Sequence, residues 1–411
     1  MSEETDAIRG GDPSTTPFTG GPLAGLRIVE FAGIGPGPMT GMLLADLGAE
    51  VVSIARPVPV DTGIARAPEY DITRRNRRNL ALDLKAPEGV ACALDLVARA
   101  DGLIEGFRPG VMERLGLGPE ICHARNPGLV YGRVTGWGQD GPLAQEAGHD
   151  LNYIALAGAL AAIGPAGGPP MAPVNFLGDY AGGGLMLAFG MVCALLERSR
   201  SGRGQVVDTA MSEGVTTLMA SYFGLRAAGI QKPGRGESLL DGGAPHYAVH
   251  ACADDLWIAV APIERKFRDR LLTLMGFDPE SFPDLDDPGQ WPRARQLMAT
   301  RFREKPRAAW LALFAGEDCC VSPVLDAGEA PHHPHFSARE SFVDVAGVTQ
   351  PAPQPRFSRS RPASPQPARE AGHDSRAVLA QWGLDPARIA TLIANGIVSD
   401  GARGDAARQT L

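Results

Sequence analysis

One short stretch near the start of the chain restricts the fold more than any other. Residues 26–32, LRIVEFA, are apolar and β-branched enough for a strand, and a turn rich in glycine and proline follows them. Residues 33–49 then show the apolar periodicity of a helix, and residues 50–57, EVVSIARP, predict a second strand. Strand, turn, helix and strand in this order form a βαβ unit, whose strands run parallel. The sequence therefore predicts an α/β fold with a parallel sheet.

The alternation of strands and helices continues to about residue 211 and then changes. Residues 247–262, YAVHACADDLWIAVAP, predict a hairpin that turns at Ala253, Asp254 and Asp255, and residues 347–369 are rich in proline and serine and are expected to be extended and exposed. We therefore expect a disordered tail at 1–21, a large domain at 22–211, a linker helix and loop at 212–242, a smaller α+β domain at 243–346, and a return segment at 347–411 whose C-terminal helices pack on the large domain.

Composition excludes several classes of protein. The net charge of −8 argues against a general nucleic-acid binder, which is usually basic. The six cysteines show no CxxC spacing, so no metal site is predicted. The polar N-terminus carries no apolar stretch of the kind found in signal peptides, and no apolar run is long and uninterrupted enough to span a membrane. We expect a cytoplasmic protein without nucleic-acid or membrane partners.

The glycine turn at residues 31–41, FAGIGPGPMTG, resembles a dinucleotide-binding turn but matches it poorly. Pro36 and Pro38 lack the backbone N–H groups that a pyrophosphate needs. The second strand ends in Ala55 and Arg56, where an NAD site would carry an acidic residue for the ribose. Arg56 favours a phosphate group, which an NADP enzyme would supply. The alternative is that these glycines only let the helix and the sheet pack closely.

Arginines accumulate in the same half of the chain, in residues 73–85, TRRNRRNLALDLK, and 105–119, EGFRPGVMERLGLGP. Guanidinium groups bind phosphate oxygens through two parallel hydrogen bonds, so a cluster near strand ends favours a polyphosphate ligand. The alternative is a solvated charged face. The arginines concerned are Arg74, Arg75, Arg77, Arg78, Arg108 and Arg114.

Two ionisable residues, His149 and Asp150, open the otherwise apolar run at 146–164, EAGHDLNYIALAGALAAIG. Taken alone, His149 is more typical of a helix cap or a surface residue than of a catalytic base. Asp150 and Asp179 are each acceptable as caps of the helices predicted to follow them. The residues by themselves therefore leave structural and catalytic interpretations open.

Taken together, the segments of this chain resemble the α-methylacyl-CoA racemases, a branch of the family III CoA-transferases. The resemblance runs from Gly21 to the C-terminal helices, in the order found in the family. It is carried by residues 21–57 and by the motifs RRNRRNLALDLK, LIEGFRPGVMERLGLGP, TGWGQDGP, AGHDLNYIALAGAL, NFLGDYAGGG, GQVVDTAM, LDGGAPHYAVHACAD and APIERKF. The chain departs from the family mainly at its tail and at residues 58–70, VPVDTGIARAPEY, which suggest an extended loop.

The resemblance implies a role for four residues. His149 is one catalytic base and Asp179, in GDYAGGG, is the other. Glu264, in APIERKF, corresponds to the carboxylate that pairs with the histidine, and Asp150 to a partner near the second base. In the transferase branch the counterpart of Asp179 is a nucleophile, and a different residue typically stands in place of the histidine.

The resemblance also implies how the substrate is held. Arg56, Arg78, Arg108 and Arg114 fall in segments that the family uses for CoA, with Ala81 and Asp83 near its adenine end. The implied fold is a large α/β domain with a Rossmann-like parallel sheet, a smaller domain, and two interlocked subunits. The active site of such a homodimer lies between the large domain of one subunit and the small domain of the other. No separate cofactor is expected, because CoA is part of the acyl-CoA thioester substrate.

The chemistry of racemisation agrees with this residue set. Inverting a carbon next to a thioester removes a proton from one face and returns one to the other, which needs acid–base groups on both faces. The first N–H groups of the helix predicted after Asp179 would suit the enolate oxygen. Two alternatives stay open: a CoA-transferase that uses Asp179 as nucleophile, and a catalytically silent subunit that binds CoA thioesters.

Overall fold

The computed structural model describes residues 20–58, 63–64 and 66–401. Residues 1–19 of the predicted tail and residues 59–62 and 65 of the predicted loop at 58–70 lie outside this part. The chain forms two compact units. The first comprises residues up to Tyr153, Phe176–Val215, and Glu340 onward, and the second comprises Ile154–Asn175 and Thr216–Arg339.

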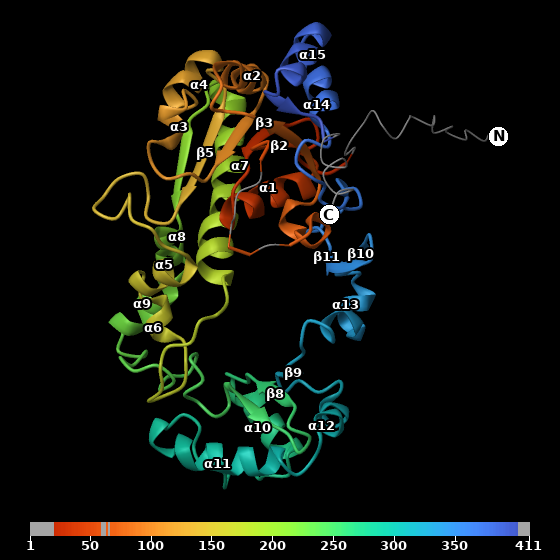
Figure 1. Ribbon diagram of the computed structural model, residues 1–411. Coiled ribbons are helices and arrows are strands. Elements are labelled where there is room, and N and C mark those ends of the chain that lie inside the picture. The colour runs from red at the N-terminus through yellow and green to blue at the C-terminus, as the bar shows by residue number, and fades with distance from the viewer. Residues whose placement is uncertain (1–19, 59–62, 65, 402–411) are drawn as a thin grey trace, which may run out of the picture. The chain divides into compact units, whose positions relative to one another are not determined.

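A seven-stranded sheet organises the first unit (Figure 1). Its strands lie in the order β12-β3-β2-β1-β4-β5-β6, and all neighbours pair in parallel except β12, which is antiparallel to β3. The order reverses at β1, as in doubly wound folds, so the predicted parallel sheet is confirmed. The strands are β1 Arg27–Phe31, β2 Glu50–Ala55, β3 Arg77–Leu82, β4 Gly102–Glu105, β5 Val130–Thr135, β6 Val206–Ala210 and β12 Val398–Ser399.

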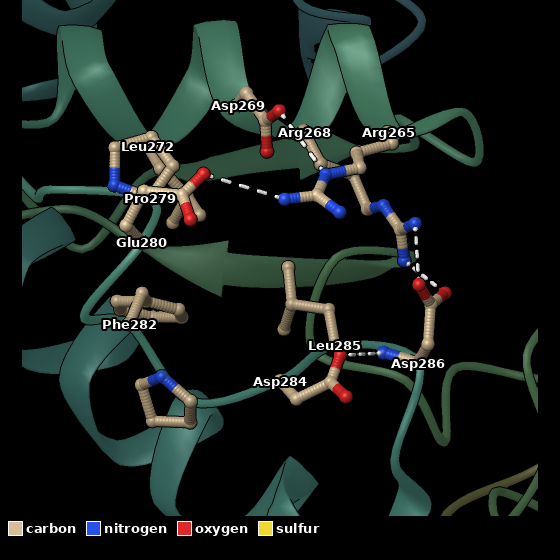
Figure 2. A pocket seen from close by; sticks show the side chains of 11 residues that line it. Arg265, Arg268, Asp269, Leu272, Pro279, Glu280, Phe282, Asp284, Leu285 and Asp286 are labelled. Carbon is tan, nitrogen blue, oxygen red and sulfur yellow. Dashed lines mark hydrogen bonds and ion pairs between the residues drawn. The ribbon is translucent and has the colours of Figure 1, made fainter.

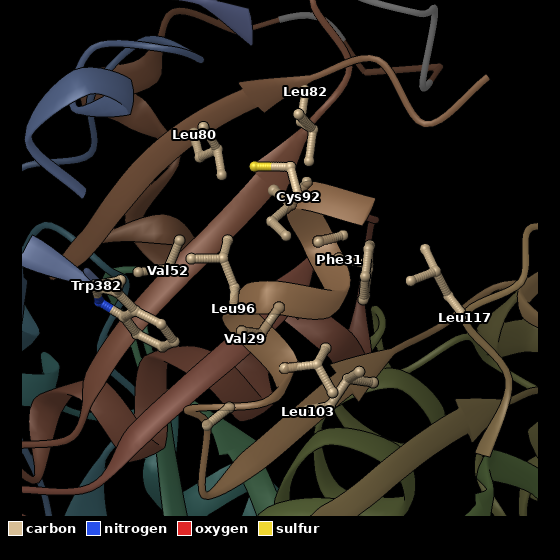
Figure 3. Packing of buried hydrophobic residues seen from close by; sticks show 14 of the residues in the cluster. Val29, Phe31, Val52, Leu80, Leu82, Cys92, Leu96, Leu103, Leu117 and Trp382 are labelled. Atoms are coloured by element: carbon tan, nitrogen blue, oxygen red, sulfur yellow. The ribbon is translucent and has the colours of Figure 1, made fainter. Parts of the chain in front are cut away.

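Helices cover both faces of this sheet because its strands are apolar on both sides. Val29 of β1 belongs to a core that includes residues of α2, α4, α14 and α15 (Figure 3), while its neighbour Ile28 belongs to a core shared with α1 and α7. Consecutive residues point to opposite faces, so such strands form continuous apolar runs. The helices are α1 Pro36–Asp46, α2 Pro87–Val97, α3 Val111–Arg114, α4 Pro119–Arg125, α7 Met186–Ser201, α14 Ser375–Gln381 and α15 Pro386–Ala394.

Strand β3 was not predicted, because its arginines were interpreted as a ligand site or a solvated face. The structure buries them instead. Arg77 donates to Glu30 at 2.9 Å, and Arg78 lies 3.2 Å from Glu50. Arg75, just before the strand, donates to both carboxylate oxygens of Asp46. Each buried guanidinium has a carboxylate partner on β1, β2 or α1, which is the condition under which a charge can be buried.

The second unit contains the predicted hairpin. Strands β7, Ala248–Ala251, and β8, Trp257–Val260, pair antiparallel, and β9, Val321–Pro323, joins them. Phe302 and Trp310 fill the core of this unit. The boundary between the units falls within two helices, α5 Asp150–Leu156 and α8 Met211–Leu218. The other helices of the second unit are α6 Ala159–Ala162, α9 Ala220–Ala227, α10 Arg265–Leu274, α11 Trp291–Phe302, α12 Arg307–Phe314 and α13 Pro334–Ala338. Short helical turns complete the chain: η1 Pro68–Tyr70, η2 Ile72–Arg74, η4 Pro288–Gln290 and η5 Ala330–His332.

The return segment differs in part from the extended, exposed chain that was expected at 347–369. Strands β10, Phe342–Val345, and β11, Val348–Pro351, form an antiparallel hairpin. Gln350 is buried, and its side-chain oxygen accepts a hydrogen bond from Arg75. The composition concealed this contact because the glutamine is buried by a partner far away in the sequence. One or two helices were expected near the C-terminus, and the structure contains two, α14 and α15.

The π-helix η3, Phe176–Leu185, continues into α7 as one helical stretch of 26 residues. By length and composition alone this stretch could cross a membrane, which corrects the expectation that no apolar run is long enough. Core helices of soluble proteins meet the same criterion, and α7 packs on β5 and β6.

Candidate active site

The order reversal of the sheet marks the place to look for a site. In open α/β sheets, ligands bind outside the carboxyl ends of the strands where the strand order reverses. Here the reversal lies at β1, whose neighbours are β2 and β4. The turn after β1 ends at Gly35, which has a φ of +65°. A Cβ atom on Gly35 would lie 3.0 Å from Oδ2 of Asp179, so the carboxylate lies directly against this turn.

Asp179 lies inside helix η3, not at its N-cap as one interpretation of the sequence held. The helix begins three residues earlier, at Phe176. The side chain of Asp179 is half-buried. The backbone N–H of Asp179 donates to Oδ1 of Asp150 at 2.7 Å. This N–H is therefore already engaged, so an enolate oxygen would need another donor.

The run of glycines after Asp179 lets η3 approach its neighbours. A Cβ atom on Gly183 would lie 2.8 Å from Cβ of Pro36, and one on Gly184 would lie 2.8 Å from Cβ of Met39. Both neighbours belong to α1, the helix that follows the turn at Gly35. The motif GDYAGGG thus brings Asp179 to the carboxyl end of β1 through close helix packing.

Asp150 is buried, with 6% of its surface exposed, and is the first residue of α5. Its Oδ1 accepts the hydrogen bond from Asp179, and its Oδ2 is buried with no hydrogen-bond partner in the described part of the chain. Asn152 accepts a hydrogen bond from the backbone N–H of His149 at 3.0 Å. Asp150 therefore holds the backbone of Asp179, and Asn152 caps the start of α5.

His149 is exposed and directly precedes Asp150. Its carbonyl accepts the hydrogen bond from the backbone N–H of Asn152 at 2.8 Å. The structure thus brings His149, Asp150 and Asp179 together in the first unit, with Asp150 as the link. Asp150 therefore connects the segment that carries an exposed imidazole to the segment that carries a half-buried carboxylate, and both groups can remove and return protons.

Tyr153 is a member of this site that the sequence analysis missed. Burial raises the pKa of its phenol, the carboxylates of Asp179 and Asp150 raise it further, and Arg108 lowers it. These effects identify the three charged residues as neighbours of Tyr153. The signal in the sequence is its spacing: Tyr153 follows His149 by four residues, which places both on one side of a helix start.

Glu264 lies in the second unit, at the N-cap position of α10. It is exposed and makes no side-chain capping hydrogen bond. Burial raises the pKa of the neighbouring Cys320 thiol, and the Glu264 carboxylate raises it further. Its pairing with His149 stays a prediction.

The residues expected to contact CoA divide into two groups. Arg56 after β2, Arg108 after β4 and Arg114 at the end of α3 are exposed. Arg78 is buried, and its guanidinium binds Glu50 and the side chain of Gln381. The exposed arginines are accessible to an anionic ligand, whereas the charge of Arg78 is already compensated inside the protein.

Ala81 and Asp83, predicted near the adenine end of CoA, lie at the carboxyl end of β3 and just beyond it. Ala81 is buried, and its backbone N–H donates to Oγ of Ser375 at 3.2 Å. Asp83 is half-buried, and its side chain accepts from the backbone N–H of Lys85. Their place near the adenine end of CoA stays a prediction.

A hollow of about 300 Å³ lies in the second unit (Figure 2). Its walls carry charges that compensate one another: Arg268 pairs with Asp286 at 2.6 Å and Arg265 with Glu280 at 3.4 Å. Among the described residues, no three His, Cys, Asp or Glu side chains gather as metal ligands would. The hollow contains none of the predicted site residues.

Comparison with known proteins places the chain. A family model described as CoA-transferase family III matches residues 23–374. The chain is 43% identical to the alpha-methylacyl-CoA racemase of Mus musculus and 40% identical to that of Homo sapiens, in each case over 92% of this chain and 97% of the relative. A crystal structure of a CAIB/BAIF family protein from Brucella suis matches with a TM-score of 0.77 at 27% identity, covering 89% of this chain and all of the other. The chain belongs to the CoA-transferase family III.

Proposed function

We propose that this protein is a racemase that interconverts the (2R) and (2S) forms of 2-methylacyl-CoA thioesters. The relatives named alpha-methylacyl-CoA racemase support this substrate class over 97% of their own length. The observation that carries the mechanism is the link through Asp150, which holds the backbone of Asp179 and directly follows His149. An imidazole and a carboxylate held by one connecting residue can serve the two faces of a single carbon.

The reaction proceeds by transfer of protons at the α-carbon. One base removes the α-proton, the C–H electrons move into the thioester as an enolate, and the other group returns a proton to the opposite face. His149 and Asp179 are the two groups, one starting deprotonated and the other protonated. Each proton transfer by a well-placed side chain contributes roughly 10²–10⁴-fold to the rate. CoA is part of the substrate, and no separate cofactor takes part.

The CoA portion binds across the carboxyl ends of the sheet. Exposed arginines after β2, after β4 and in α3 face the phosphates, namely Arg56, Arg108 and Arg114. Arg78, Ala81 and Asp83 shape the adenine end, with Arg78 acting through the packing of β3 because its charge is paired with Glu50. This assignment is supported by the rule that parallel sheets bind ligands at this edge.

The protein acts in the cytoplasm as an interlocked homodimer, with Glu264 of one subunit orienting His149 of the other. A stripe of exposed apolar residues supports a partner surface: Leu185 at the end of η3 and Phe189, Val192 and Leu196 of α7 recur at helical spacing, with 37% to 67% of each exposed. Such a stripe is the usual mark of a helix face that packs against another element.

The alternative is a CoA-transferase in which the Asp179 carboxylate attacks the thioester carbonyl, breaks the C–S bond, releases the CoA thiolate and forms a mixed anhydride. The family as a whole favours it, since the matching family is named for that activity. It requires an acyl acceptor and no chemistry at the α-carbon. His149 is unused in that reaction.

Incubation with a (2R)-2-methylacyl-CoA in D₂O distinguishes the racemase from the CoA-transferase. The racemase incorporates one deuterium at the α-carbon and yields both stereoisomers, whereas the transferase leaves the α-carbon protonated. In the racemase, His149→Ala and Asp179→Asn each abolish inversion but retain α-exchange of one stereoisomer, the opposite one in each variant. Loss of acyl exchange in Asp179→Asn with no α-deuterium in the wild type identifies the transferase.

A further inference from the structure

The hydroxyl of Tyr153 donates a hydrogen bond to the carbonyl of Gly148, the residue immediately before His149. Tyr153 has 7% of its surface exposed and Gly148 is half-buried, so this bond is partly shielded from water. A carbonyl can only accept, so the phenol must keep its proton for the bond to exist. The bond thus fixes the peptide that leads into His149.

Close neighbours on several sides restrict the position of the Tyr153 ring. The ring meets the edge of Trp137 with centroids 4.8 Å apart and planes at 86°. A Cβ atom on Gly148 would lie 2.8 Å from the Tyr153 ring, and one on Gly136 would collide with it. The ring therefore fits a slot that exists because residues 136 and 148 are glycines.

Two further hydrogen bonds hold the same loop. Nε2 of Gln145 donates to the carbonyl of Pro109 at 3.2 Å, which ties the start of the loop to the turn that carries Arg108. The backbone N–H of His149 donates to the Asn152 side chain at 3.0 Å. Residues 145–149 are thus held at both ends. The bond from Tyr153 is made to Gly148 itself, the residue before His149.

We propose that Tyr153 is a positioning residue for His149, which sets the orientation of the imidazole by holding the Gly148 carbonyl. The inference rests on the proposed function, in which His149 serves one face of the substrate. Tyr153 contacts Gly148, the residue next to His149 in the chain, and takes no proton from the substrate. Because the phenol donates its one proton to the Gly148 carbonyl, its loss should affect chiefly the exchange step at the His149 face.

Tyr153→Phe tests this, because it removes the hydroxyl and keeps the ring. The measurement is α-deuterium exchange of each stereoisomer in D₂O, with His149→Ala as the reference that identifies which stereoisomer depends on His149. We expect the exchange of that stereoisomer to fall roughly ten- to hundredfold, since small misplacement of a catalytic group has costs of this size. Exchange of the other stereoisomer and KM should change by less than about twofold.

Tyr131→Phe is the matched control. Tyr131 is buried in the same unit, and its hydroxyl donates to the carbonyl of Leu117 at 2.9 Å. Both variants lose one buried phenol-to-carbonyl bond, but only Tyr153→Phe should lose exchange at one face. Equal loss at both faces in Tyr153→Phe, or no loss at either, overturns the positioning role. A wild-type protein that exchanges neither stereoisomer overturns the proposed function instead, so the two failures are distinguishable.

Discussion

The backbone N–H of Asp179 and the side chain of Asp150 are joined by a hydrogen bond of 2.7 Å between residues 29 positions apart. This bond connects the start of α5 to the first turn of η3. Because His149 directly precedes Asp150, one buried carboxylate determines how two segments meet. The relative position of the proposed bases therefore depends on a residue that need not transfer a proton itself.

Replacing Asp150 tests this dependence. Asp150→Ala removes the acceptor and should destabilise the protein by about 1.5–3 kcal/mol, the range for a hydrogen bond to a charged group. It should also lower kcat strongly. Asp150→Asn keeps an oxygen in place, and should recover most of the stability and part of kcat. Denaturant unfolding and steady-state kinetics measure both, and an Ala variant with wild-type kcat would contradict the linking role.

Gly35 should be sensitive to a single added methyl group for two separable reasons. Its φ of +65° and ψ of −117° strain any side chain, at a cost of about 1–3 kcal/mol, and a Cβ would lie 3.0 Å from the Asp179 carboxylate. Gly25 has a φ of +91° with no atom within 4 Å of such a Cβ, so it is a matched control for strain alone. We expect Gly35→Ala and Gly25→Ala to lose comparable stability, but only Gly35→Ala to lose kcat. Equal kcat values in the two variants would remove the steric argument.

The exposed and buried arginines should respond differently to removal. Arg108→Ala or Arg114→Ala should weaken binding of a CoA thioester by about 1.5–3 kcal/mol and leave stability nearly unchanged. Arg75→Ala breaks a buried ion pair with Asp46 and should cost about 3–5 kcal/mol of stability, without making binding less sensitive to salt. Calorimetric titration at two salt concentrations, beside thermal unfolding, separates the groups. Identical binding of CoA and dephospho-CoA thioesters by wild type and variants would show that these arginines do not recognise the 3′-phosphate.

The second unit should lose stability in mild acid. The pKa of His246 is lowered from 6.5 to about 4, chiefly by burial and also by the nearby Arg268, while Asp286 acts in the opposite direction. Below pH 6.5 the unfolded chain gains a proton that the folded protein excludes, so stability present above that pH is lost as the pH falls toward 4. The loss amounts to about 3 kcal/mol. His246→Phe should flatten this pH dependence in denaturant unfolding; an unchanged slope would show that His246 is not its source.

The proposed homodimer predicts that defective subunits complement one another. Co-refolding His149→Ala with Glu264→Ala should restore part of the activity, because one of the two mixed sites would contain both intact residues. Each variant refolded alone serves as the control. Sedimentation should give a dimeric mass at micromolar concentration. A monomeric mass with full activity, or mixtures no more active than their components, would exclude a shared site.

The parallel sheet could be predicted because β1, α1 and β2 have the apolar periodicity that local sequence reveals. Strand β3 could not, because Arg77 and Arg78 resemble an exposed segment until Glu30 and Glu50 are known to lie beside them. These partners are 47 and 28 residues away, and only the tertiary fold brings them close.

Part of the candidate site, likewise, could be predicted from the sequence and part could not. The resemblance selected His149 and Asp179 by motif. Tyr153 was overlooked because its function depends on the Gly148 carbonyl, a backbone group that every residue carries and no motif marks. Hydrogen bonds to the backbone leave a signal only in the residues that make room for them, here the glycines at 136 and 148.

The core of the first unit has a consequence for the order in which the chain is synthesised. Trp382 and Val398 pack in the same cluster as Val29 and Val52, so the face of the sheet formed by early residues is completed by residues translated more than three hundred positions later. The whole of Thr216–Arg339 leaves the ribosome in between. During that interval the apolar face of β1 and β2 lacks its last covering helices. The nascent chain therefore exposes apolar surface of β1 and β2 until α14 and α15 have emerged.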